Sequence, residues 1–251
     1  MKQFIIRTLS GITLLTATSV LASADQAPWS YQGETGPAHW GEITPDNQSC
    51  ALGHEQSPIN IEAATKDKTL PQLHFHYQPA ALQIINNGHT VQVNIPAGSF
   101  VEIDDKRYRL IQFHMHTPSE ETIHGKHFPM VAHLVHQDET GKLVVVAIEF
   151  KIGENNAELM RVVQHLPREK SDEQRFADVL IDPAGLLPRK TGYYTFTGSL
   201  TTPPCSEGVT WFVLKQPQTL SRMEWRNLHS VLGDNARPVQ PLNDRKIEQT
   251  L

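Results

Sequence analysis

The chain has 251 residues, of which 39% are hydrophobic and 20% charged, and its formal net charge is −5. This composition excludes a multi-span membrane protein, a collagen and a disordered chain, and the length suits one hydrophobic core better than two. Because no basic block occurs, nucleic acid is not an expected partner. The chain carries 13 histidines and only 2 cysteines, and histidine is the commonest metal ligand.

Residues 1–24 have the features of a secretory signal peptide. Lys2 and Arg7 precede an apolar stretch, and Ala22-Ser23-Ala24 has the small-x-small form of a cleavage site. The apolar stretch is short and is broken by Thr and Ser, which disfavours the alternative of a membrane anchor. We therefore expect a mature domain over residues 25–251, with no membrane span and a periplasmic or secreted location.

That location bears on the two cysteines. In an oxidising compartment Cys50 and Cys205 are expected to form a disulfide, and the alternative is a pair of buried thiols. The bond would close a loop of roughly 155 residues, contributing on the order of 5 kcal/mol in the chain-entropy model. It would also anchor the loop that contains Thr201 and Thr202. A zinc site built from three or four cysteines is excluded by the count.

The predicted elements are mostly strands. Runs rich in β-branched and aromatic residues predict strands at 91–95, 108–116, 130–137, 143–150, 192–196 and 209–214. A turn at 139–142 joins two of them. Helical periodicity occurs at 159–166 and 228–232, and Ser221 with Glu224 forms a capping box before the second helix. The pattern predicts a mainly β (α+β) domain, with one large sheet and short peripheral helices.

Two histidines in one predicted strand share a face. In the segment 112–116, residues two apart point the same way, so Gln112, His114 and His116 lie together. The next strong strand carries His133 as a third candidate ligand. Three neutral imidazoles would leave an open position on zinc for water, which is typical of a catalytic site. However, His74 and His76 have the same spacing, so spacing alone leaves both pairs as candidates.

The neighbouring motifs identify a family. In order along the chain they are Gln56-Ser57-Pro58-Ile59-Asn60-Ile61, Asn86-Asn87-Gly88-His89, Gln112-Phe113-His114-Met115-His116, Pro118-Ser119-Glu120, Ala132-His133-Leu134-Val135-His136, Ser199-Leu200-Thr201-Thr202-Pro203-Pro204 and Arg237-Pro238-Val239-Gln240-Pro241-Leu242. Over essentially the whole mature chain, this set resembles the α-class carbonic anhydrases of the bacterial secreted type.

The resemblance implies a fold and an activity. The fold would be a large twisted, mostly antiparallel sheet of about ten strands, and His114, His116 and His133 would bind Zn²⁺. The activity would be reversible hydration of CO2 to bicarbonate and a proton, by attack of zinc-bound hydroxide. Sulfonamides and anions would act as inhibitors. The Ser57–Pro58 and Pro203–Pro204 bonds are expected to be cis.

The resemblance also implies individual roles. Thr201 would accept a hydrogen bond from the hydroxide and donate its own proton to Glu120, and His89 would carry protons out of the site. Gln112 and the carbonyl of Asn235 would hold His114 and His116. Tyr31, Asn87 and Gln92 would order the water chain. The substrate pocket would comprise Val135, Val145, Leu200, Thr202, Val209 and Trp211.

The sequence departs from the family pattern at two positions. Val131 lies two residues before His133, at a position where the family usually has a glutamate. Glu121 occupies a position where many members have a histidine. One hypothesis is that Glu121 supplies the carboxylate for His133; the alternative is that Glu121 is solvated. A second function therefore stays open: a catalytically weakened relative that binds zinc or a partner. The sequence leaves both a monomer and a homodimer possible.

Overall fold

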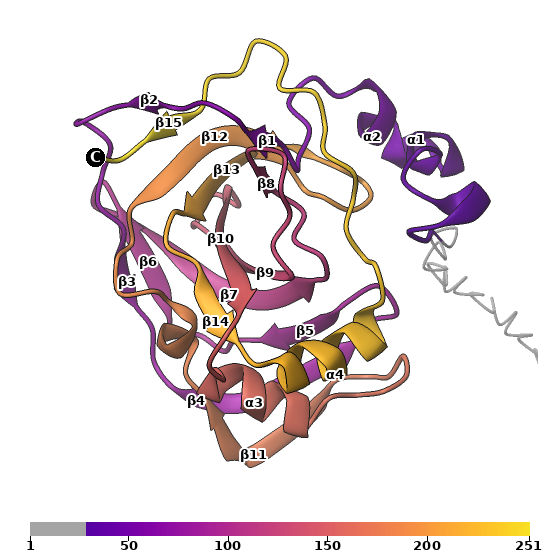
Figure 1. Cartoon of the computed structure of the whole chain (residues 1–251), viewed down its shortest axis with the longest axis vertical. Coiled ribbons are helices and arrows are strands. Elements are labelled where there is room, and N and C mark those ends of the chain that lie inside the picture. The colour runs from indigo at the N-terminus through magenta and orange to yellow at the C-terminus, as the bar shows by residue number, and fades with distance from the viewer. Residues whose placement is uncertain (1–28) are drawn as a thin grey trace, which may run out of the picture.

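The computed structural model describes residues 29–251, so the expected signal peptide at 1–24 lies outside the described residues. Within them, one sheet of 13 strands dominates (Figure 1). Its strands are β2 (Thr65–Lys66), β3 (His74–His76), β4 (Ala80–Asn86), β5 (Val91–Asn94), β6 (Phe100–Ile103), β7 (Lys106–His116), β9 (Met130–Gln137), β10 (Leu143–Ile152), β11 (Gln174–Ile181), β12 (Tyr193–Ser199), β13 (Glu207–Leu214), β14 (Gln218–Leu220) and β15 (Glu248–Gln249).

The sheet is mostly antiparallel, as expected. Its path runs β11-β4-β5-β7-β9-β10-β13-β12-β15-β2, and β3, β6 and β14 pair beside that path. The central pairs β7–β9 and β9–β10 are antiparallel, whereas β10 and β13 are parallel. A separate two-stranded sheet joins β1 (Asn60–Ile61) to β8 (Thr122–Ile123). The predicted fold class is therefore confirmed.

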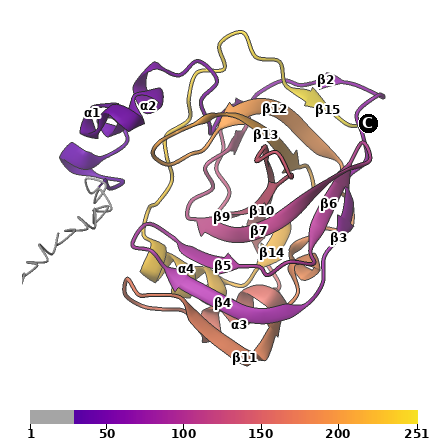
Figure 2. The ribbon, with the colours of Figure 1, turned by 180° about the vertical axis from the view of Figure 1, so that it is seen from behind.

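The helices are short and lie at the edges of the sheet. They are α1 (Trp40–Ile43), α2 (Ser49–Leu52), α3 (Ala157–Gln164) and α4 (Arg222–Leu232), with 3₁₀ turns at Gly33–Thr35, Pro45–Asn47 and Pro183–Leu186. The capping box predicted at Ser221 and Glu224 starts α4. Figure 2 shows α3 and α4 together on one side of the molecule, far from α1 and α2. Among the described helices, none has the length and apolar character needed to cross a membrane.

The central strands separate two apolar clusters because alternate side chains point to opposite faces. Phe113 and Met115 of β7 join the larger cluster, which also contains Leu159 of α3 and Leu228 of α4. The smaller cluster on the other face includes Val131, Val145, Val209 and Trp211. Gln112, His114 and His116 alternate with Phe113 and Met115, so they point to the face of the smaller cluster.

The expected disulfide joins Cys50 and Cys205, and it packs against Trp40 in a third small cluster. It ties α2 to the loop between β12 and β13. Three X–Pro bonds in the described chain are cis, namely Ser57–Pro58, Thr117–Pro118 and Pro203–Pro204.

Candidate active site

Three imidazoles converge on the inner face of the sheet. His114 of β7 is paired directly with His133 of β9, and His116 follows two residues after His114. Their ring centroids are 4.9–5.4 Å apart, and one ligand nitrogen from each lies within 4.8 Å of the others. Among the described residues this is the only histidine cluster with that geometry. His74 and His76 are exposed on β3 and do not take part.

Each ring is held through its outer nitrogen. His114 Nδ1 donates to Gln112 Oε1 at 2.8 Å, and His116 Nδ1 donates to the Asn235 carbonyl oxygen at 2.7 Å. These bonds set the tautomers so that both Nε2 atoms face the centre of the cluster. Asn235 itself is fixed, because its side chain bonds the backbone of Thr117 and of His89.

The third ring is held by Glu121. His133 Nε2 lies 3.2 Å from Glu121 Oε2, so its Nδ1 is the nitrogen that faces the cluster. Both residues are buried, and Val131, two residues before His133, packs in the apolar cluster. The carboxylate next to His133 therefore comes from the loop after β7 and not from β9.

The chemistry of these donors fits a metal ion such as Zn²⁺. Burial, reinforced by the charge of His133, lowers the pKa of His114 to about 3, and the same two causes lower that of His116 well below its usual value. Burial also lowers the pKa of His133, but Glu121 and, to a smaller extent, Glu120 together outweigh this and leave it raised. His116 Nε2 is buried and has no hydrogen-bond partner. A cation between the rings would satisfy that nitrogen.

Thr201 and Glu120 lie beside the three rings. Burial raises the pKa of Glu120 to about 7, while His133, the backbone N–H of Arg237 and the Thr201 hydroxyl all lower it. The Arg237 N–H donates to Glu120 Oε1 at 2.8 Å, and Glu120 Oε2 lies 3.4 Å from His116 Nε2. The carboxyl group is therefore in a position to accept a hydrogen bond from the Thr201 hydroxyl.

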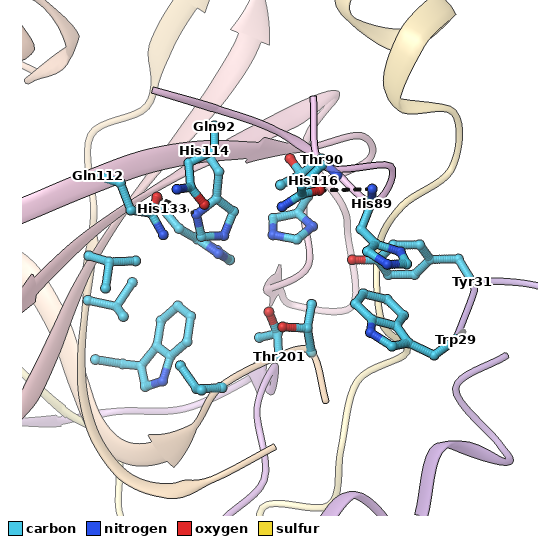
Figure 3. Close-up of a pocket in the computed structure, with 16 residues that line it drawn as sticks. Trp29, Tyr31, His89, Thr90, Gln92, Gln112, His114, His116, His133 and Thr201 are labelled. Carbon is cyan, nitrogen blue, oxygen red and sulfur yellow. Dashed lines mark hydrogen bonds between the residues drawn. The ribbon is translucent and has the colours of Figure 1, made fainter. Parts of the chain in front are cut away.

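A cavity of about 240 Å³ opens over the histidines (Figure 3). One wall is apolar and the opposite rim is aromatic and polar. Of the expected pocket and water-network residues, Tyr31, Asn87, Gln92, Gln112, Val135, Val145, Leu200, Thr202 and Trp211 line it, together with Thr201 and His89. Val209 is not among the residues that line the cavity, and it packs with Trp211 in the smaller apolar cluster.

His89 lies at the rim of the cavity. Its ring stacks on Trp29, with centroids 3.6 Å apart and planes 7° from parallel (Figure 3). Asn87 fixes the turn, because its Oδ1 accepts the N–H groups of both His89 and Thr90. Burial, and after it Lys170, lowers the pKa of His89. Trp29 and Thr90 were not identified from the sequence; Trp29 carries no recognisable motif and reaches the cavity only through the fold.

The motif residues away from the cavity form its frame. Arg237 is buried and donates to Gln56 Oε1, to the Ser57 carbonyl and to the Cys50 carbonyl. Gln56 in turn donates to the Cys205 carbonyl. These bonds lock the segment around Gln56 to the loop that carries Thr201.

A family model for the eukaryotic-type carbonic anhydrases matches residues 35–251. The chain therefore belongs to the α-class carbonic anhydrase family, whose general reaction is the hydration of CO2.

Named relatives cover nearly the whole chain. A carbonic anhydrase of Pectobacterium atrosepticum is 42% identical over 93% of this chain and 96% of its own length. One from Nostoc is 38% identical over 96% of this chain and 93% of its own length. The solved complex of the Thermovibrio ammonificans α-carbonic anhydrase with sulfanilamide is 44% identical, with a TM-score of 0.85 over 88% of this chain and 99% of that one. Dioscorin complexed with ascorbate also matches, at 31% identity and a TM-score of 0.83 over 89% of this chain and 99% of that one.

Proposed function

We propose that this protein catalyses the reversible hydration of CO2 to bicarbonate and a proton, with Zn²⁺ held by His114, His116 and His133. The observation that carries the proposal is the convergence of three oriented imidazoles, two of them with lowered pKa values, on a cavity that Thr201 closes from the other side. Bound Zn²⁺ would supply a Lewis acid that makes water nucleophilic near pH 7, the general property of this family's metal.

The residues around the cavity have separate tasks in this reaction. Glu120 accepts a hydrogen bond from the Thr201 hydroxyl, so the lone pairs of the Thr201 oxygen are left to accept a hydrogen bond from the attacking oxygen nucleophile. CO2 is apolar and needs no charged clamp, and Val135, Val145, Leu200 and Trp211 give it an apolar wall. Thr202 lines the same side and faces the bicarbonate that forms.

Proton removal falls to His89. Each turnover leaves one proton in the cavity, and a group that titrates near the working pH transfers it best. His89 lies at the rim and is about half-buried, so it can exchange protons with both the cavity and the solvent. Tyr31, Asn87 and Gln92 line the intervening space and would order the water that connects them.

We infer that Glu121 takes the place of the glutamate missing at position 131, since it meets His133 Nε2 at 3.2 Å. We further propose a periplasmic or secreted protein, supported by the disulfide and by the bacterial relatives. Sulfonamide binding is proposed from the similarity to the sulfanilamide complex.

The alternative is a member of the fold used for binding alone. The similarity to dioscorin, which was solved in complex with ascorbate, is the observation that supports this alternative. The intact contact among Glu120, Thr201 and the three histidines favours catalysis, since binding alone does not require an oriented hydroxyl.

Stopped-flow CO2 hydration decides between the two functions. The zinc-loaded protein should accelerate hydration, and both a chelator and a sulfonamide should abolish the acceleration. Restoring zinc after chelation should restore the rate. If the zinc-loaded, folded protein gives only the uncatalysed rate, the enzymatic function is wrong.

A further inference from the structure

Glu149 of β10 is a buried acid that the proposed reaction does not use. Its side chain is 1% exposed, and neither carboxyl oxygen has a hydrogen-bond partner among the described residues. A buried carboxyl group without partners is costly, because it has lost its bonds to water. Such a group in a well-packed sheet calls for an explanation.

The position of Glu149 points to the metal site. It is paired across the strands with Val131, and the next pair on the same face joins Ala147 to His133. Directly opposite residues of neighbouring strands point the same way. Glu149 therefore lies on the face of His133, beside the position from which the family's glutamate is missing.

Glu121, the carboxylate next to His133, also has one buried oxygen without a hydrogen-bond partner. Its Oε2 is occupied by His133 Nε2, whereas its Oε1 is buried and has no partner. The charge of Glu121 acts on Glu149: burial first, and then this charge, raises the pKa of Glu149 well above its usual value. A like charge nearby disfavours the ionised form, so burial and Glu121 together favour the neutral form of Glu149.

The hydroxyl of Ser119 also acts on Glu149, and it lowers the pKa of the Glu149 carboxyl group. This hydroxyl also lies 2.8 Å from the backbone carbonyl of Glu121 and has one proton, so it can satisfy only one of these acceptors at a time and leaves at least one oxygen of Glu149 without a donor. Glu149 thus has a proton to donate, and Glu121 Oε1 is a buried acceptor without a donor.

We propose that Glu149 is a positioning residue for the metal centre: its carboxyl group donates a hydrogen bond to Glu121 Oε1 and fixes the carboxylate that holds His133. The inference rests on the proposed role of His133 as a ligand. In this chain, the single glutamate missing from β9 is replaced by a pair, one from the loop after β7 and one from β10. Val131 itself packs in the smaller apolar cluster.

Zinc dissociation into excess chelator tests the proposal without using activity. Glu149→Leu should release zinc about 10-fold faster, at the lower end of the effect of residues that orient metal ligands. Glu149→Gln should release zinc at close to the parent rate, because its amide N–H can still donate to Glu121. Glu149→Met serves as a second apolar variant if the leucine variant does not fold, and thermal melting checks folding in each.

A double-mutant cycle separates this role from a general effect on packing. If Glu149 acts through Glu121, Glu149→Leu should add nothing to the dissociation rate of Glu121→Ala. Equal effects in both backgrounds, or a glutamine variant as fast as the leucine variant, would overturn the inference.

Infrared spectroscopy provides a second test that needs no truncation. At a pH well above 7, where Glu120 is ionised, the parent should show the carbonyl stretch of a buried protonated carboxyl group. Glu149→Gln should remove that band, and its persistence in the variant at the same pH would contradict the proposal. A parent protein that releases zinc as fast as His133→Ala would instead refute the metal centre itself, and this inference with it.

Discussion

At the level of single residues, the Thr201 hydroxyl carries the most specific expectation. Thr201→Ala should lower kcat/KM by about 10- to 100-fold, because a hydrogen bond to a charged group is worth about 1.5–3 kcal/mol. Zinc content should not change, since Thr201 is not among the ligands. Thr201→Ser keeps the hydroxyl and should retain most of the activity. Stopped-flow assays with metal analysis measure both, and an alanine variant with parental kcat/KM would contradict the role of this hydroxyl.

His89 affects proton transfer and not the conversion of CO2. His89→Ala should lower kcat by at least about 10-fold in dilute buffer, leave kcat/KM unchanged and recover when imidazole is added.

The pH dependence follows from the pKa of the same residue, which burial and Lys170 lower. His89 must be neutral to accept a proton, so kcat should rise with pH through a value below 6.5 and then level off. A profile that is unaltered in His89→Ala would show that another group carries the proton.

Glu121 is expected to strengthen metal binding. Glu121→Ala should weaken zinc affinity by about 10- to 100-fold, because His133 loses the acceptor for its outer N–H. Glu121→Gln, whose amide oxygen can still accept, should lose less. Competition with a chromophoric chelator gives both affinities. Equal zinc affinity in the parent and in Glu121→Ala would mean that His133 does not depend on this carboxylate.

At the level of elements, the loop between β12 and β13 depends on a clamp. The disulfide joins Cys205 of this loop to Cys50, and Gln56 and Arg237 bond the same two segments. Replacing both cysteines by alanine should lower the free energy of unfolding by about 2–5 kcal/mol. Because Thr201 lies on the clamped loop, turnover should fall as well. Urea unfolding and stopped-flow assays test the two effects, and unchanged activity would separate the clamp from the site.

The elements also differ in how well their sequences predict them. β9 was predicted with its observed bounds, because the run 130–137 is apolar and rich in strand-forming residues. β11 was not predicted, since most of its residues are exposed and give no clear alternation. Its strand conformation comes from pairing with β4, a contact between segments about 90 residues apart.

At the level of the whole molecule, the buried side chain of His136 makes the free energy of unfolding depend on pH. It points to the face opposite the metal cluster, and its Nε2 lies 2.7 Å from the Tyr77 hydroxyl. Burial lowers its pKa to about 3, although two backbone hydrogen bonds oppose the shift. The unfolded chain binds this proton near pH 6.5, so folding is progressively penalised as the pH falls from about 6.5 to 3.

Replacement of His136 should therefore reduce the acid sensitivity of the metal-free protein. His136→Gln, which can still bond Tyr77, should lose less stability between pH 7 and pH 4 than the parent does. Urea unfolding at the two pH values measures the difference, with His74→Gln as an exposed control. Identical pH dependence in His136→Gln and the parent would show that His136 is not a source of the acid sensitivity.

The sequence by itself determined the class of fold, the family and the identity of the three histidines, because strand periodicity and short motifs are local properties. It placed Gln112, His114 and His116 on one face, since a strand repeats every two residues. Spacing alone did not distinguish the pair His114 and His116 from the pair His74 and His76. Only the motifs next to His114 and His116 did so.

The tertiary structure decided what depends on distant segments meeting. It brought Trp29 onto His89, placed Val209 with Trp211 in the smaller apolar cluster and set Glu121 against His133. It also brought Glu149 near enough for the charge of Glu121 to act on it, although the two are 28 positions apart in the chain. Such contacts are fixed by strand register and by packing across the sheet, and neither is written in the spacing of residues along the chain.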